Sequence, residues 1–192
     1  MTSQLFWNNK AITYVALSLG FGAVYALNNV LTAPLLLAPG AHLIHLPSGF
    51  KFLLVLVFGA VGAFSIFTVS LCAGLGYYFA SNIPLCFELA TANAMAPWLT
   101  RRFFLDHSLL QENLSNLSWK SLLTMGVLFS VLNSSLNQLI LYWNQVILNM
   151  VDGLGIMLIG DLSGVLLVVG LIRLTLTVFK AENSHVSGTD KD

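Results

Sequence analysis

The sequence predicts an all-helical (all-α), polytopic transmembrane helix bundle of about six spans. Of its 192 residues, 57% are hydrophobic and only 8% are charged, whereas a soluble domain carries about 25% charged residues. So few charges do not cover the surface of a soluble protein of this size. Long apolar runs, separated by short turn-rich or polar segments, complete the pattern, because a helical span needs about 20 mainly apolar residues.

The first half of the chain contains two long apolar runs. The run from Ala11 to Leu37 is too long for the core of a signal peptide and predicts an uncleaved first span. A link rich in proline and glycine, Ala38 to Gly49, follows it. The next run, Phe50 to Ala80, would measure about 46 Å as one helix, more than the bilayer core of about 30 Å. We therefore expect two shorter helices with a break near residues 58–64. A single tilted helix, giving five spans in total, is the alternative.

The second half predicts three more spans and one polar segment. The spans cover Ile83–Trp98, Ser121–Trp143 and about Ile156–Phe179, the last preceded by a loop or re-entrant segment at residues 144–155. Between the first two, Thr100–Lys120 has apolar residues at roughly helical spacing, which predicts an amphipathic helix on the membrane surface. Residues 1–180 thus form a single transmembrane domain, and the polar residues 181–192 predict a disordered tail.

The distribution of basic residues predicts the orientation. Arg101, Arg102 and Lys120 all lie in the polar segment, so the positive-inside rule places it in the cytoplasm. With six spans, both termini fall on the same side. We expect a multi-pass membrane protein, surrounded by the lipid bilayer, with both termini in the cytoplasm. The chain is not basic enough to bind nucleic acid.

Ionisable side chains at membrane depth indicate where a site lies. They cost about 2.5–3.5 kcal/mol each on insertion scales and therefore face the bundle interior or water. Asp161 cannot pair with Arg173, which is about 18 Å further along the same helix, so its partner must come from another span. Asn133 and Asn137 share one helical face and are the first candidates. Glu88 completes the candidate polar cluster, with a position near the interface as its alternative. The amides fit interhelical packing and a ligand-lining face equally well.

Metal-binding and catalytic motifs are weak or missing. His42 and His45 would share a face if helical, which makes them weak metal candidates, but no third ligand is near and an ordinary interfacial pair is expected. Cys72 and Cys86 lie in apolar runs and fit packing. The sequence has no G-x-S-x-G, no H-E-x-x-H and no phosphate-binding glycine loop, and Asp161 lacks the Gly-x-Gly of an intramembrane protease. We expect no catalytic activity and no cofactor.

Two separated segments carry a resemblance to a known family. The first is IHLPSGFKFLLVLVFGAVGAF, Ile44–Phe64, with a Pro-x-Gly motif, and the second is IGDLSGVLLVVGLI, Ile159–Ile172, with a Gly-Asp-x-x-Gly motif. Both resemble the corresponding helices of MASE1 domains, which are bacterial inner-membrane sensory regions usually placed before histidine kinase or diguanylate cyclase domains. The resemblance implies a sensory module with a possible small-molecule ligand. The pattern residues that carry over are Pro47, Gly49, Gly160, Asp161 and Gly164.

The chain departs from that family in three respects. It shows no output domain, it has fewer than the expected eight helices, and it has Val169-Gly170 where the family tends to have a proline. The resemblance implies a location in the bacterial inner membrane. A free-standing module there would act through another protein, bound through the 100–120 loop or the C-terminal tail. A second hypothesis is the substrate-capture subunit of an energy-coupling-factor vitamin transporter, because a bundle of six short helices also resembles such subunits. Docking on the energising module would then use small residues such as Ala16, Gly20 and Ala23. A third is a structural accessory subunit of a larger membrane complex.

Overall fold

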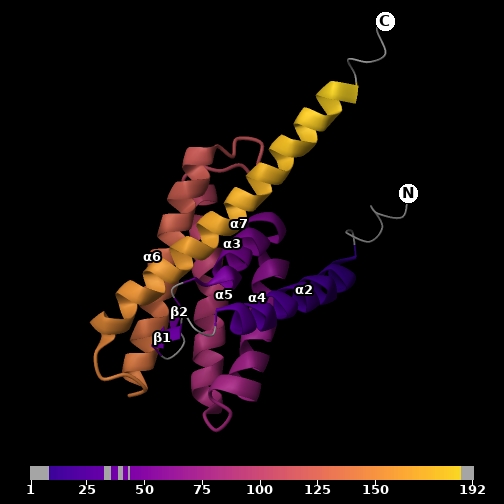
Figure 1. The fold of residues 1–192 in the computed structure, drawn as a ribbon. Coiled ribbons are helices and arrows are strands. Elements are labelled where there is room, and N and C mark those ends of the chain that lie inside the picture. Colours follow the sequence, from indigo (N-terminus) through magenta and orange to yellow (C-terminus); the bar gives the residue numbers. More distant parts are fainter. Residues whose placement is uncertain (1–8, 33–35, 39–40, 43, 187–192) are drawn as a thin grey trace, which may run out of the picture.

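The computed structural model describes residues 9–32, 36–38, 41–42 and 44–186 and shows a helical bundle (Figure 1). The predicted all-helical fold is therefore confirmed, with one short hairpin as its only addition among the described residues. The α-helices are α2 (Lys10–Leu31), α3 (Leu46–Phe58), α4 (Ala60–Ala73), α5 (Ile83–Asp106), α6 (Trp119–Trp143) and α7 (Met150–Val186). The π-helix η2 (Gly74–Tyr78) continues α4, and strands β1 (Leu36–Ala38) and β2 (Ala41–His42) pair antiparallel.

Several helices have the length and surface of membrane spans. Four segments are long and apolar enough to cross a membrane, namely Lys10–Leu31, Ala60–Tyr78, Trp119–Trp143 and Gly153–Leu174. Their outward faces carry large exposed apolar side chains, such as Leu19 and Leu166. A soluble monomer rarely exposes apolar surface continuously along its helices, whereas lipid solvates such surface without cost. The chain is thus a multi-pass membrane protein.

The apolar block at residues 50–80 forms two helices, as predicted, and the single tilted helix is wrong. Gly59 separates α3 from α4 with a φ of 56° and a ψ of −126°, a region that only glycine adopts readily. A Cβ added at Gly62 would overlap the backbone of Leu54, so the two helices cross closely. With 13 residues, α3 is about 20 Å long, which is shorter than a full span.

The helix α3 begins inside the bundle. Pro47 lies in its first turn, where a missing N–H loses no helical hydrogen bond. The backbone before it is held on both sides, because Leu46 N donates to Asn28 Oδ1 of α2 (3.0 Å) and His45 N donates to Gly160 O of α7 (3.2 Å). The expectation that the turn-rich link extends to Gly49 is therefore wrong: the last residues of that link form the first turn of a helix.

Two glycines bring α3 against α7. A Cβ at Gly49 would overlap the carbonyl oxygen of Gly164, and a Cβ at Gly164 would overlap the carbonyl oxygen of His45. Both obstacles are backbone atoms, which cannot rotate away as a side-chain end can. Only glycine at both positions allows this approach, and the contact places the first turn of α3 beside the middle of α7.

The polar segment at residues 100–120 does not form the predicted amphipathic helix. Helix α5 continues to Asp106, and residues 107–118 form a series of turns before α6 begins. Ser108 and Leu114 have φ values of 57° and 58°, which interrupt a helix. Leu110 is buried in a core cluster with Phe104 and Phe129, and Leu114 and Leu117 pack against it, whereas Phe103 and Leu109 are exposed. Much of the apolar surface of this segment therefore covers the bundle.

The last helix is longer than predicted. It begins at Met150 and includes Gly153 and Gly155, so the expected loop or re-entrant segment at residues 144–155 shortens to residues 144–149. It also takes in residues 181–186 of the expected tail, while residues 187–192 lie outside the described part. Figure 1 shows the C-terminal part of α7 projecting beyond the other helices.

The two ends of the bundle differ in charge. We call the end that holds Gly59 and the 107–118 turns the basic end, because the described side chains of Arg101, Arg102, Lys120 and Arg173 lie there. Arg101 Nε donates to Leu56 O (3.2 Å), and the Arg173 guanidinium lies 4.9 Å from the centre of the Trp119 ring. The opposite end, with the 79–82 and 144–149 turns, has an exposed Glu88 and no Lys or Arg among the described residues.

Candidate functional site

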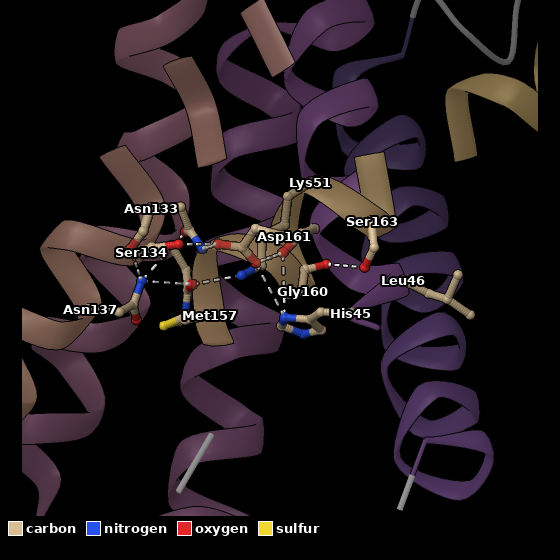
Figure 2. Close-up of polar contacts among 12 residues, drawn as sticks. His45, Leu46, Lys51, Asn133, Ser134, Asn137, Met157, Gly160, Asp161 and Ser163 are labelled. Carbon is tan, nitrogen blue, oxygen red and sulfur yellow. Dashed lines mark hydrogen bonds and ion pairs between the residues drawn. The ribbon is translucent and has the colours of Figure 1, made fainter. Parts of the chain in front are cut away.

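Asp161 is fully buried and its carboxylate joins three helices. Its Oδ2 accepts hydrogen bonds from Asn133 Nδ2 (2.7 Å) and Ser134 Oγ (3.1 Å) on α6. Its Oδ1 accepts a hydrogen bond from Ser48 Oγ on α3 and lies 3.5 Å from His45 Nδ1 (Figure 2). A buried carboxylate is costly unless such partners satisfy it. Asn133 is thus the partner that we predicted on another span. Ser134, Ser48 and His45 are further partners that the sequence did not indicate.

The N-terminus of α3 adds to this stabilisation. His45 is its N-cap residue and Ser48 lies in its first turn, so the carboxylate of Asp161 meets the positive end of the helix dipole. An anion at that position gains about 0.3–1 kcal/mol on exposed helices and up to about 2 kcal/mol in partly buried geometry. This interaction explains why α3 starts at the level of Asp161 in the bundle interior.

Lys51 supplies a buried positive charge that the sequence reasoning missed. Only 1% of the residue is exposed, and its Nζ donates to Asn93 Oδ1 on α5 (2.6 Å). It is close enough to Asp161 for their charges to interact. One signal was present: Lys51 is the only charged residue between Lys10 and Glu88. Its place at the start of an apolar run made it look like a residue flanking a span.

The amide side chains link the two charges. Asn137 Nδ2 donates to Asn133 O (2.8 Å) and contacts Asn93 Oδ1 at 3.4 Å, so Asn137 lies one step from the carboxylate. Figure 2 shows Lys51 of α3, Asn133 and Asn137 of α6 and Asp161 of α7 converging, and Asn93 joins them from α5. We use the term polar cluster for His45, Ser48, Lys51, Asn93, Asn133, Ser134, Asn137 and Asp161.

Glu88 does not belong to the polar cluster, which corrects its predicted place. Its side chain is exposed, and its Oε2 accepts a hydrogen bond from Asn144 Nδ2 (2.7 Å) at the end of α6. Helix α5 begins at Ile83, so Glu88 lies about one turn from the end of the bundle. Asn93, five residues further along the same helix, is the residue that reaches the cluster.

The histidines do not form a metal site in the described part of the chain. His45 contacts Asp161 and Ser48, while the side chain of His42 lies outside the described residues. The described residues contain no group of three or more His, Cys, Asp or Glu side chains that could hold a metal ion. Cys72 and Cys86 are both free thiols.

A cavity of about 80 Å³ lies beside the polar cluster. It extends from Lys51 toward the opposite end of the bundle, where Tyr25 and Tyr78 lie edge to face and Tyr78 Oη donates to Asn29 Oδ1 (2.9 Å). Its volume is a few times the ~30 Å³ that a water molecule occupies in the liquid, and below the roughly 300–1,000 Å³ of sites for drug-sized ligands. The cavity can therefore hold a few waters or one very small molecule.

Several hydrogen-bond donors at this cavity are unused. An ammonium group has three N–H donors, and the only acceptor for Lys51 among the described residues is Asn93 Oδ1. The amide nitrogen of Asn93 has no acceptor in the described part of the chain, and Ser70 Oγ, buried in the cavity wall, has no partner there either. A buried polar group without a partner costs about 1–3 kcal/mol, a cost that applies here to Ser70 Oγ, whereas Asn93 is only partly buried. An occupant that bonds to Ser70 would relieve that cost and could also accept hydrogen bonds from Lys51 and Asn93.

The pattern residues of the MASE1 resemblance meet in one place. Pro47 and Gly49 form the first turn of α3, which contacts Gly160, Asp161 and Gly164 of α7. The two separated segments are thus a single structural unit. Comparison of the chain with protein-family models, with curated proteins and with solved structures finds no match. Membership of the MASE1 family accordingly stays a prediction from the two motifs.

Proposed function

We propose that this chain is a ligand-binding sensory module of the bacterial inner membrane, similar to MASE1 domains, that acts through a partner protein. The observation that carries the proposal is the cavity beside the buried Lys51 and Asp161, where hydrogen-bond donors have no acceptor among the described residues. A subunit that only packs against other helices has no need of a buried cation facing an open volume, because burying charge is costly.

The helix arrangement supports transmission of a signal. The carboxylate of Asp161 joins α3, α6 and α7, and α7 runs from there to Val186, beyond the rest of the bundle (Figure 1). A ligand shifts a conformational equilibrium by its difference in affinity for the two states. A ligand that moves Lys51 would shift α3, whose first turn bonds to Asp161 of α7 through Ser48, and the projecting part of α7 would convey that change.

The charges at the two ends support an orientation. The basic end falls in the cytoplasm by the positive-inside rule, so the 107–118 turns and the C-terminal part of α7 face a cytoplasmic partner. The cavity extends toward the other side, which faces out of the cell. A cysteine placed at Asn113 would then resist a membrane-impermeant thiol reagent in whole cells, whereas one at Ser81 would react; the reverse labelling would contradict this orientation.

The volume of this cavity weighs against its binding a vitamin. A vitamin needs a site in the range of roughly 300–1,000 Å³, and the cavity measures about 80 Å³.

The identity of the partner protein also distinguishes a sensory module from a transporter subunit. Photo-crosslinking from Asn113 in native membranes is expected to capture a histidine kinase or a cyclase, while capture of an ATPase with its coupling subunit would contradict sensing.

Ligand binding is tested on the purified protein in lipid nanodiscs. A panel of uncharged, anionic and cationic solutes of up to about four non-hydrogen atoms is added, and the melting temperature is measured. A solute at ten times its Kd stabilises by about 1.4 kcal/mol, or a rise of about 3–6 °C. Ser70→Leu, which fills the cavity, should abolish the rise, and Ser81→Leu, at an exposed turn, should keep it. The absence of a rise with every solute would contradict ligand binding.

A further inference from the structure

We infer that the ligand of this cavity is a very small molecule without net charge that offers an oxygen acceptor, of the primary amide class. This inference rests on the proposed function, since it names the chemistry of the molecule that the cavity binds. It is carried by three properties of the site, namely the unused donors, the balance of buried charge and the volume.

The unused donors require an acceptor. Two N–H groups of Lys51 and the amide nitrogen of Asn93 have no acceptor among the described residues, and both side chains line the cavity. Ser70 Oγ, on α4, is the third polar group there that the rest of the described chain does not satisfy. A carbonyl oxygen accepts two hydrogen bonds and can thus serve Lys51 and one neighbour. The hydroxyl of Ser70 can then accept an N–H of the ligand.

The balance of charge requires that the ligand be neutral. Lys51 and Asp161 carry opposite charges, interact with each other and are each at most 1% exposed. His45 also lines the cavity, and apart from His45 and Lys51 no described Asp, Glu, Lys, Arg or His side chain does so. We take His45 as the neutral tautomer that directs its Nδ1–H toward Asp161 Oδ1, 3.5 Å away, and the site is then neutral before the ligand arrives. An anion or a cation would introduce one uncompensated buried charge, which the low-dielectric interior strongly disfavours.

The small volume favours a ligand of a few atoms. The cavity offers about 80 Å³ and is partly open to the outside, so it suits a molecule of about four non-hydrogen atoms better than a drug-sized ligand. Acetamide has this size, a carbonyl oxygen for Lys51 and an NH₂ group for Ser70. A ligand this small binds no tighter than about 40 µM by the ceiling on affinity per atom, so the experiment uses millimolar concentrations.

The test compares three probes of equal size and different charge: acetamide, acetate and acetamidinium. Each is titrated against the full chain in nanodiscs, and the Kd is taken from the rise in melting temperature. We expect the wild-type protein to bind acetamide at least about tenfold more tightly than either ion. Asp161→Asn leaves one positive charge and should favour acetate, whereas Lys51→Met leaves one negative charge and should favour acetamidinium. Arg102→Gln, which removes a surface pair with Asp106, should keep the wild-type order.

The outcomes separate the ligand class from the function. If the wild-type protein binds acetate or acetamidinium most tightly, or binds only other solutes of the panel, the amide class is overturned and ligand binding stands. If no solute binds at all, both the amide class and the proposed ligand-binding function are overturned. The order of the three probes on the wild-type protein decides the ligand class even where a variant does not fold.

Discussion

Replacing Gly164 by alanine is expected to separate α3 from α7 and so to dismantle the polar cluster. The added Cβ would overlap the carbonyl oxygen of His45, a backbone atom of the residue that caps α3. Overpacking of this kind costs about 1–3 kcal/mol or more, and the shift would also weaken the bond from Ser48 to Asp161, at about 0.6–1.7 kcal/mol. Alanine regains about 1 kcal/mol of helix propensity. The net loss is therefore about 2 kcal/mol at the centre of these ranges.

Gly170 provides the matched control on the same helix. A Cβ there meets nothing within 4 Å, so Gly170→Ala should gain up to about 1 kcal/mol from helix propensity. At about 2–4 °C per kcal/mol for a chain of this length, Gly164→Ala should melt about 4–8 °C below the wild type and Gly170→Ala at or slightly above it. The assay is thermal unfolding of both variants in nanodiscs. Equal melting temperatures for the two variants would refute the close contact of α3 with α7.

Three further predictions concern the charges, the amides and the break between α3 and α4. Lys51→Met and Asp161→Asn should each destabilise the protein by about 3–5 kcal/mol, because each leaves the other buried charge without a countercharge. The double variant should lose less than the sum, and additive losses in denaturant unfolding would contradict the interaction between the two charges. Asn133→Ala should lower the free energy of unfolding by about 0.6–1.7 kcal/mol, and Asn144→Ala, outside the polar cluster, should lower it less. A larger loss for Asn144→Ala than for Asn133→Ala would contradict the hydrogen bond from Asn133 to Asp161. Gly59→Ala should cost about 1–3 kcal/mol because of its positive φ, and an unchanged unfolding midpoint would disprove that conformation.

The fold was predictable because its signals are local. Composition and apolar run length show a membrane bundle, and the small residues at 58–64 allow the break that Gly59 provides. The contact between Asp161 and Asn133 was predictable for a different reason. A carboxylate at membrane depth needs a partner, and few polar side chains were available on the other spans.

The remaining features depend on contacts distant in sequence. Lys51 reaches Asn93 because of how α5 is rotated in the bundle, which no local pattern reports. Proline and glycine occur in the first turn of a helix as well as in loops. The sequence therefore predicted that the helix begins after Gly49, whereas α3 begins at Leu46. The 107–118 turns have apolar residues at helical spacing, yet Leu110 turns inward against the bundle core, and the positive φ at Ser108 is invisible in the sequence.

The most direct test of the account is a density map of the wild-type protein in nanodiscs that resolves ordered water, recorded with and without acetamide. We expect acetamide-dependent density within hydrogen-bond distance of Lys51 Nζ and Ser70 Oγ, with Asp161 still bonded to Asn133. An empty cavity under both conditions, or a Lys51 side chain turned toward the lipid, would contradict the claim that these residues form a ligand site.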